Sequence, residues 1–125
     1  MKFGIIKERK NPPDRRVVFT PEEAANIKNQ FPETEIIVES SDIRIFSDDE
    51  YKNKGLEIVE DVSDCDVLFG VKEVPVDSLI PNKKYFFFSH TIKKQVHNKK
   101  MLQAILDKDI TLYDHETVVD VNNRR

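Results

Sequence analysis

The stretch CDVLFGVKEVP, residues 65–75, decides the fold. Its apolar positions Val67, Leu68, Phe69 and Val71 are nearly continuous and do not alternate with polar residues. Such a strand is typical of a sheet buried on both faces, because a solvated face would place a polar residue at every second position. We therefore expect this strand to lie inside a sheet that other elements cover from both sides.

Further strands and helices alternate around this stretch. Thr20 can cap a helix that has Pro21 at its first position, and Gly55 can close a second, short helix. Alternation over connections of this length predicts an α/β fold with a mostly parallel sheet and helices on both faces. This is a Rossmann-like, flavodoxin-type half without a glycine-rich nucleotide loop. Strands are expected at residues 2–6, 34–39, 56–61, 65–75, 83–90 and 110–116, and helices at 20–31, 48–55 and 91–109.

Composition limits the classes of protein to consider. The 125 residues suffice for one domain with a single core. A net charge of −3 and a pI near 5.6 argue against a nucleic-acid partner, which usually selects a basic surface. No apolar run approaches the roughly 20 residues that span a membrane, and no targeting segment is visible. We expect a cytoplasmic protein, or a mitochondrial-matrix protein in a eukaryote.

Several kinds of chemistry lack the residues that they need. Cys65 lies between two aspartates, which raise the pKa of a thiol, so it is a poor nucleophile. The 3 glycines form no phosphate-binding pattern. His90, His97 and His115 lack the spacing of metal ligands, so we expect no metal site. His97 and His115 are interpreted as surface or packing residues.

Charged residues follow three of the expected strands. The first strand leads to Glu8 and then to Arg15 and Arg16, the strand at 65–75 contains Lys72 and Glu73, and the aromatic strand ends at His90. Parallel strands end at one edge of a sheet, where ligands bind. Arginine, lysine and histidine gathered there suit an anionic substrate and proton transfer. Each residue also has a structural interpretation, as a helix cap or a solvated side chain.

Four blocks of the sequence resemble a known family. They are KFGIIKERKNPPDRRVVFTP (2–21), CDVLFGVKEVP (65–75), LIPNKKYFFFSHTIKKQ (79–95) and LYDHETVVDVNNRR (112–125). In this order they resemble the amino-terminal domain shared by alanine dehydrogenase, proton-translocating transhydrogenase and lysine-forming saccharopine dehydrogenase. The block at 79–95 and the Tyr-Asp-x-Glu sequence are most similar to the lysine-ketoglutarate reductase of the saccharopine pathway.

The resemblance implies a reaction and a set of site residues. The reaction is the reversible, NAD(P)-linked conversion of lysine and 2-oxoglutarate to saccharopine through an imine. Lys72 and His90 fall on the acid-base positions, and Arg16 falls on a position that binds a substrate carboxylate. Lys93 and Arg125 match further substrate-binding positions, and Glu73 and Glu116 match acidic residues that tune the charge of the site.

The resemblance also implies a partner domain. Residues 1–125 correspond to the amino-terminal catalytic and substrate-binding domain of a larger dehydrogenase, and the NAD(P)-binding domain would follow the final arginine pair. We therefore expect the chain alone to bind no cofactor and to be inactive. The choice between NAD and NADP, the direction of the reaction, the oligomeric state and the roles of Arg15 and Arg16 stay open.

Two other interpretations remain. The chain could be the corresponding domain of an alanine-dehydrogenase-like amino acid dehydrogenase, which activity with pyruvate and ammonia would indicate. It could instead be a non-catalytic binding module that kept the fold. A stop codon after Arg125, without a partner subunit that carries a dinucleotide fold, would favour the binding module.

Overall fold

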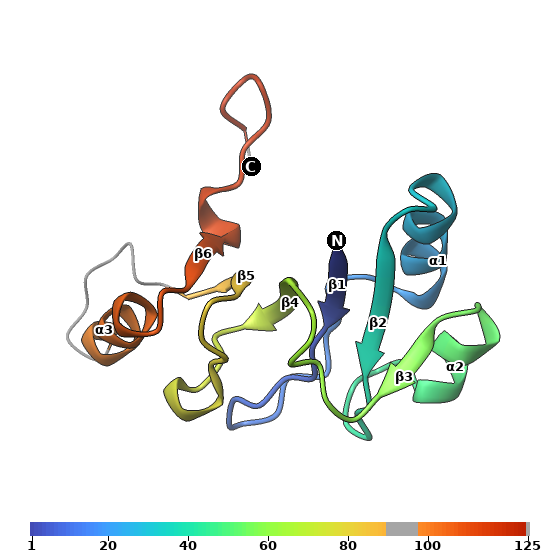
Figure 1. The fold of residues 1–125 in the computed structure, drawn as a ribbon, viewed down its shortest axis with the longest axis horizontal. Coiled ribbons are helices and arrows are strands. Elements are labelled where there is room, and N and C mark those ends of the chain that lie inside the picture. Colours follow the sequence, from blue (N-terminus) through green and yellow to red (C-terminus); the bar gives the residue numbers. More distant parts are fainter. Residues whose placement is uncertain (90–97, 125) are drawn as a thin grey trace.

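A single sheet organises the chain. The computed structural model describes residues 1–89 and 98–124. Six parallel strands lie in the order β3-β2-β1-β4-β5-β6 (Figure 1). They are β1 (Lys2–Ile5), β2 (Glu35–Glu39), β3 (Glu57–Val59), β4 (Val67–Lys72), β5 (Lys84–Phe88) and β6 (Thr111–Asp114). The predicted α/β class with a parallel sheet is confirmed.

The strand order places a switch in winding direction at the centre of the sheet. The chain moves outward from β1 to β2 and β3, then returns to the other side of β1 and continues through β4, β5 and β6. This is the 3-2-1-4-5-6 order of dinucleotide-binding sheets, whereas a flavodoxin-type sheet runs 2-1-3-4-5. Local strand patterns do not distinguish the two orders, because neighbours in a sheet are chosen by long-range packing. The ends of β1 and β4 therefore flank a crevice of the kind that binds ligands.

The first two helices begin where the capping signals predict. α1 (Pro21–Gln30) and α2 (Asp48–Asn53) each begin with a reciprocal pair of hydrogen bonds between the capping residue and the glutamate three positions later. In α1 the Thr20 hydroxyl accepts from the Glu23 amide while the Glu23 carboxylate accepts from the Thr20 amide. Gly55 follows α2 with a φ of 86°, a conformation that glycine adopts without strain.

The third helix is shorter in the described residues than the predicted range 91–109. α3 runs over Lys99–Asp107, and residues 90–97 lie outside the described part of the chain. Two short 3₁₀ turns complete the elements, η1 (Val76–Ser78) and η4 (His115–Thr117), the second directly after β6. None of the helices within residues 1–89 and 98–124 combines the length and the apolar character needed to cross a membrane.

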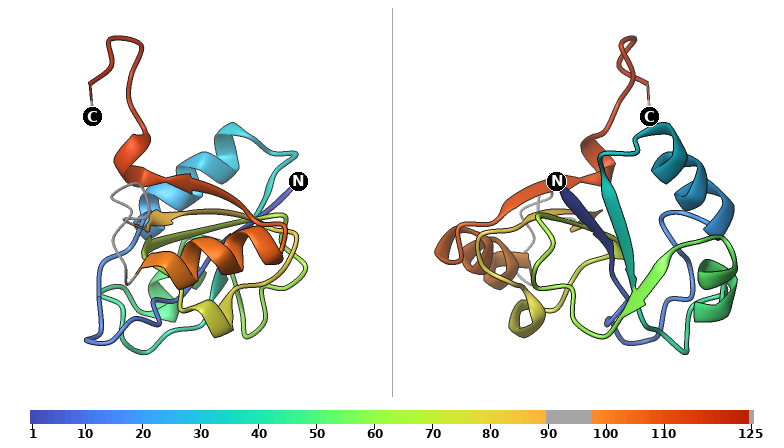
Figure 2. Two further views of the ribbon diagram at one scale, coloured as in Figure 1. Left: turned by 90° about the vertical axis from the view of Figure 1, so that its left-hand side faces the viewer. Right: turned by 45° about the vertical axis from the view of Figure 1, so that its right-hand side comes forward.

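The two faces of the sheet have separate cores. On one face Ala24 of α1 and Tyr51 of α2 pack with Ile5, Ile36 and Val38 from β1 and β2. On the other face α3 packs against the central and outer strands, and Figure 2 shows it on the opposite side from α1. The buried residues of this second core include Leu68, Tyr85, Phe87, Met101, Ala104 and Ile105. Helices on both faces are thus confirmed.

Burial of the central strands is less even than the continuous apolar pattern predicts. Phe69, Phe86 and Tyr113 form a stacked row across β4, β5 and β6, with ring centroids 4.8 and 4.6 Å apart. The two phenylalanines are half-buried and Tyr113 is 43% exposed. The continuous apolar run therefore does not lead to full burial of this aromatic row.

Candidate functional site

An open groove lies along the carboxyl edge of the sheet. It has a volume of about 660 Å³. Its walls come from the loop after β1, the ends of β4 and β5, and the turn after β6, so four segments of the chain contribute to it. The lining residues are Arg16, Val17, Val18, Val71, Phe88, His115, Glu116 and Val118. The groove therefore combines an apolar wall with one cation, one carboxylate and one imidazole.

Arg16 supplies the cation of this groove, and Arg15 does not. The Arg16 guanidinium donates to both Asp14 carboxylate oxygens, at 2.7 to 3.2 Å, and its side chain is 64% exposed. These hydrogen bonds lower the pKa of Asp14 and raise that of Arg16. Arg15 instead donates from Nε to the carbonyl of Ile43, 3.2 Å away. The sequence left open which of the two arginines faces the ligand edge of the sheet, and in the structure Arg16 lines the groove.

Lys72 ends β4 beside this groove. It is half-buried, and its backbone amide donates to the Glu8 carboxylate at 2.6 Å. Its charge reaches Asp14, since Lys72 and Arg16 both lower the pKa of that carboxyl group. Lys72 and Arg16 therefore both act electrostatically on the same carboxylate, as expected for residues at the ends of adjacent strands.

Glu73 pairs with a cation that the sequence analysis did not single out. Its carboxylate accepts a hydrogen bond from the ammonium of Lys10, and its side chain is largely buried. Lys10 lies in the loop after β1, 63 residues earlier in the chain. Part of the negative charge of Glu73 is thus compensated by a lysine other than its neighbour Lys72.

The ends of β5 and β6 are tied together beneath the groove. The hydroxyl of Ser89, which is fully buried, donates to the carboxylate of Asp114. Asp114 also accepts a hydrogen bond of 2.9 Å from the Glu116 amide, which orients the turn after β6. The segment up to Ser89 and the turn that carries Glu116 are therefore held in fixed relative positions.

His115 was expected to be a surface or packing residue, and the structure places it in the wall of the groove. Its Nε2 lies 2.9 Å from the carbonyl oxygen of Gly70, and its ring centroid is 5.0 Å from that of Phe88. A carbonyl oxygen only accepts, so Nε2 carries the proton of this hydrogen bond. His115 directly follows β6, and this position at a strand end is the signal in the sequence that could have identified it.

Glu8 is a second residue that the sequence analysis left without a role. Its half-buried carboxylate accepts from the amides of Val71 and Lys72. Burial raises the pKa of Glu8, and the two amide donors oppose that rise. Glu8 lies in the loop after β1 and Lys72 ends β4, and these two strands flank the switch in winding direction.

Three of the predicted site residues lie outside the described part of the chain: His90, Lys93 and Arg125. Their roles stay predictions from the sequence. Among residues 1–89 and 98–124, no three histidine, cysteine or acidic side chains are grouped so that they could hold a metal ion.

The described residues do not fit a dinucleotide. Gly4 and Gly70 lie within β1 and β4, and Gly55 follows a short helix, so none of the 3 glycines forms a turn between a strand and a helix. The loop after β1 contains Pro12 and Pro13 where a pyrophosphate cradle would need backbone amides.

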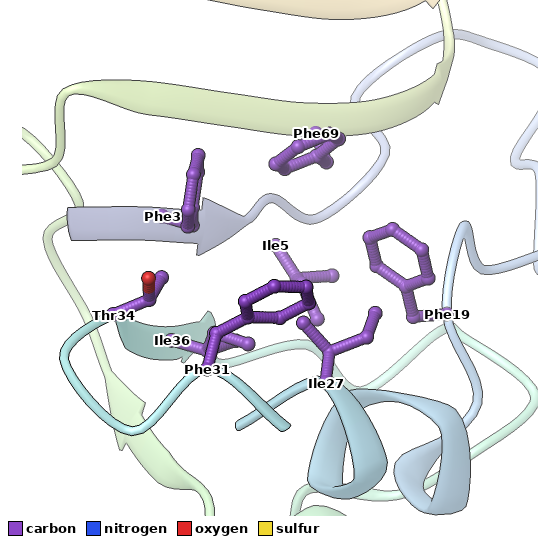
Figure 3. A pocket seen from close by; sticks show the side chains of 8 residues that line it. All are labelled: Phe3, Ile5, Phe19, Ile27, Phe31, Thr34, Ile36 and Phe69. Atoms are coloured by element: carbon purple, nitrogen blue, oxygen red, sulfur yellow. The ribbon is translucent and has the colours of Figure 1, made fainter. Parts of the chain in front are cut away.

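A second cavity is apolar and lies away from these charges. It has a volume of about 330 Å³ and lies between α1 and the sheet (Figure 3). The rings of Phe3, Phe19 and Phe69 border it, and its remaining lining residues are Ile5, Ile27, Phe31, Thr34 and Ile36. With no charged group in its lining, this cavity does not suit an anionic substrate.

Comparison with known proteins identifies the relatives of the chain. The family model described as "Alanine dehydrogenase/PNT, N-terminal domain" matches residues 4–125. An alpha-aminoadipic semialdehyde synthase of Arabidopsis thaliana is 36% identical over 126 residues, which cover 98% of this chain and 12% of the plant protein. A protein named "Saccharopine dehydrogenase [NAD(+), L-lysine-forming]", from Yarrowia lipolytica, is 34% identical over 96 residues, covering 73% of this chain and 26% of the fungal one.

Solved structures share the fold. An L-alanine dehydrogenase superposes with a TM-score of 0.79 and 21% identity, covering 98% of this chain and 34% of that protein. The chain thus spans about an eighth to a third of the length of the proteins that it matches.

Proposed function

We propose, from the premise that this chain belongs to the alanine dehydrogenase/PNT N-terminal domain family, that it is the substrate-binding and acid-base domain of a saccharopine-forming dehydrogenase. Relatives of the chain include an L-alanine dehydrogenase and a lysine-forming saccharopine dehydrogenase, and the chain is a domain of that oxidoreductase family. The finer proposal is the reversible condensation of lysine with 2-oxoglutarate and reduction of the product to saccharopine.

One observation carries this proposal: Arg16 and Lys72 both act on Asp14 at the carboxyl edge of the sheet, in a chain whose relatives include a lysine-forming saccharopine dehydrogenase. Saccharopine and 2-oxoglutarate carry several carboxylates. An arginine binds a carboxylate through two parallel hydrogen bonds and keeps its charge at every physiological pH. The groove beside Arg16 therefore offers the recognition that such a substrate needs.

The proposed proton transfers use Lys72 and His90. Lys72 accepts a proton from the ε-ammonium of the substrate lysine, so that the free amine attacks the ketone carbon of 2-oxoglutarate. The product is a carbinolamine, and His90 protonates its hydroxyl group, which leaves as water when the imine forms. In the reverse direction the same groups hydrolyse the imine. Arg16 binds a substrate carboxylate during these steps, with Lys93 and Arg125 as further contacts.

Two acidic residues would set the charge of this cationic site. Glu116 lies in the wall of the groove, and Glu73 lies next to Lys72 in the sequence and pairs with Lys10. A carboxylate near a lysine or histidine raises the pKa of the protonated base, and a second cation lowers it. The two carboxylates and Lys10 would together set the net charge around the acid-base groups.

We propose that the nicotinamide cofactor, NAD or NADP, is bound mainly by a separate dinucleotide-binding domain. In the full-length enzyme this cofactor supplies the hydride that reduces the imine. Residues 1–125 then form the amino-terminal domain of the enzyme, and the isolated chain binds no cofactor and is inactive.

The test is a pair of assays on the complete enzyme that carries this domain. We expect oxidation of NADH or NADPH with lysine plus 2-oxoglutarate. Activity with pyruvate plus ammonia alone would contradict the proposal and favour an alanine dehydrogenase. No turnover with either pair, in an enzyme that binds saccharopine, would favour a binding module.

A further inference from the structure

The end of β4 is irregular where it carries Lys72. β4 pairs with β5 in regular register as far as Phe69 opposite Phe86, and then Lys72 pairs with Phe88. Three steps along β4 thus correspond to two steps along β5, so β4 contains one extra residue. Such a bulge changes the direction of the side chains that follow it.

Two side chains from other segments hold this bulge. The Glu8 carboxylate accepts from the Val71 amide at 3.0 Å and from the Lys72 amide at 2.6 Å. The His115 imidazole donates from Nε2 to the Gly70 carbonyl at 2.9 Å. Three consecutive residues of the bulge, Gly70 to Lys72, are therefore fixed by side chains, one from the loop after β1 and one from the turn after β6.

The alternative to this bulge is a regular strand. In regular register Val71, and not Lys72, would lie opposite Phe88. Because side chains alternate between the faces of a strand, a shift of one residue turns Lys72 to the opposite face. The hydrogen bonds of Glu8 and His115 stabilise the bulged form, since a regular strand would move the amides and the carbonyl away from these two partners.

The tight packing around Gly70 supports this interpretation. A side-chain carbon at Gly70 would lie 3.0 Å from an Ile6 methyl group and 3.2 Å from a Glu8 carboxylate oxygen. Glu8 therefore approaches the backbone of β4 closely because this position has no side chain. The packing leaves the Glu8 carboxylate directly beside the two amides that it accepts from.

We propose that Glu8 and His115 are positioning residues that fix the direction in which Lys72 leaves β4. This inference rests on the proposed function, in which Lys72 transfers protons. The two residues act on the backbone of the bulge and need not touch the substrate. Loss of either partner allows the bulge to relax, and the Lys72 side chain then changes direction.

The first experiment measures Lys72 without any enzymatic activity. The 125-residue chain is labelled with acetic anhydride at several pH values, and mass spectrometry gives the rate at Lys72 and at Lys52, an exposed lysine of α2. In Glu8→Gln and His115→Leu we expect the Lys72 rate to change about threefold or more, because a side chain that turns to the other face of the strand meets different neighbours and solvent, with no change at Lys52. Glu22→Gln, at an exposed carboxylate of α1, is the matched control.

The second experiment is kinetic and uses the complete enzyme. We expect Glu8→Gln and His115→Leu to lower kcat about tenfold or more, because a displaced acid-base group loses its alignment, and to leave the KM for 2-oxoglutarate within about twofold. His115→Gln, whose amide can donate to the Gly70 carbonyl, should recover most of the kcat.

The outcomes separate the two proposals. If the wild-type enzyme does not use lysine and 2-oxoglutarate, the proposed function fails, and the labelling rates still decide whether Glu8 and His115 position Lys72. Unchanged Lys72 labelling in folded Glu8→Gln and His115→Leu chains would overturn the inference. If Glu8→Gln does not fold, Glu8→Asp takes its place, because it keeps the charge and shortens the reach.

Discussion

At the scale of single residues, the environment of Lys72 is set by partners that are distant in the sequence. The Glu8 carboxylate accepts a hydrogen bond from the Lys72 amide, and the adjacent Glu73 forms an ion pair with Lys10. Lys72 and Arg16 both act on Asp14, whose pKa they lower. The loop after β1 therefore supplies the charged groups that surround Lys72.

Replacement of the two proposed acid-base residues tests their roles. In the complete enzyme, Lys72→Met and His90→Gln should each lower kcat with lysine and 2-oxoglutarate by about 10²-fold or more, the usual effect of removing a general acid or base. Circular dichroism should show an unchanged fold. Lys52→Met, at an exposed lysine of α2, is the control and should keep normal turnover. Near-normal turnover in both variants would refute the assignment.

The two neighbouring arginines provide a matched test of substrate binding. Arg16 lines the groove, whereas Arg15 bonds to a backbone carbonyl of another loop. We expect Arg16→Gln to raise the KM for 2-oxoglutarate by about tenfold or more, because a charge-assisted hydrogen bond contributes about 1.5–3 kcal/mol. Arg15→Gln should change it little. Equal effects of the two substitutions would remove Arg16 from the substrate site.

At the scale of elements, the amino terminus of α2 is attached to the end of β2 through Asp48. The Asp48 carboxylate accepts from the Ser40 hydroxyl at 2.6 Å and from the Ser41 amide at 3.1 Å, and it pairs with the buried Arg44. Burial opposes ionisation, but these hydrogen bonds and the charge of Arg44 prevail and keep the pKa of Asp48 below its ordinary value.

The depressed pKa of Asp48 makes its contribution to stability depend on pH. The stabilisation is fully present above the ordinary pKa of 3.8 and is lost as the pH falls through the lower value of the folded state. Asp48→Asn should therefore lower the free energy of unfolding at pH 7 by about 1 kcal/mol, a discounted value because Asp48 is partly exposed. Urea titrations should show this difference shrinking below pH 3.8. Asp49→Asn, on the exposed side of α2, is the control. A difference in the free energy of unfolding between wild type and Asp48→Asn that does not change with pH would contradict this role of Asp48.

At the scale of the whole molecule, the centre of the sheet depends on a close approach between β1 and the segment before β4. A side-chain carbon at Gly4 would lie 2.9 Å from both the Cys65 sulfur and a Leu68 methyl group. Cys65 is fully buried, and burial raises the pKa of its thiol to about 11, so it acts as an apolar packing group. The packing of β1 against β4, whose ends lie at the ligand edge of the sheet, depends on this contact.

Gly4→Ala should therefore destabilise the whole domain. Extra volume in a closely packed core costs about 1–3 kcal/mol, since neighbouring side chains and backbone must shift. Urea unfolding followed by circular dichroism should show one transition at a lower midpoint. Gly55→Ala is an instructive comparison, because open space surrounds that position and only its positive φ penalises a side chain. A wild-type midpoint for Gly4→Ala would contradict the packing at the sheet centre.

The sequence predicted those features of the fold and site that depend on short-range patterns. Thr20 and Pro21 mark the start of α1, and the apolar runs mark the strands, because capping and burial act within a few residues. Arg16 and Lys72 were singled out from the sequence because Lys72 ends a strand and both residues match family blocks, and their roles stay predictions. Glu8 was given no role of its own and His115 was interpreted as a surface or packing residue, because a single polar residue beside a strand has no local pattern that distinguishes a backbone-holding role from a solvated one.

What the sequence by itself determined is the set of strands and helices, their parallel arrangement and the cationic character of the strand ends. The tertiary structure alone decided the strand order, the choice between Arg15 and Arg16, the pairing of Glu73 with Lys10 and the two side chains at the Gly70–Lys72 bulge. The physical reason is separation along the chain. Those contacts join residues 28 to 64 positions apart, and such pairs form only when the packing of the whole sheet brings them together.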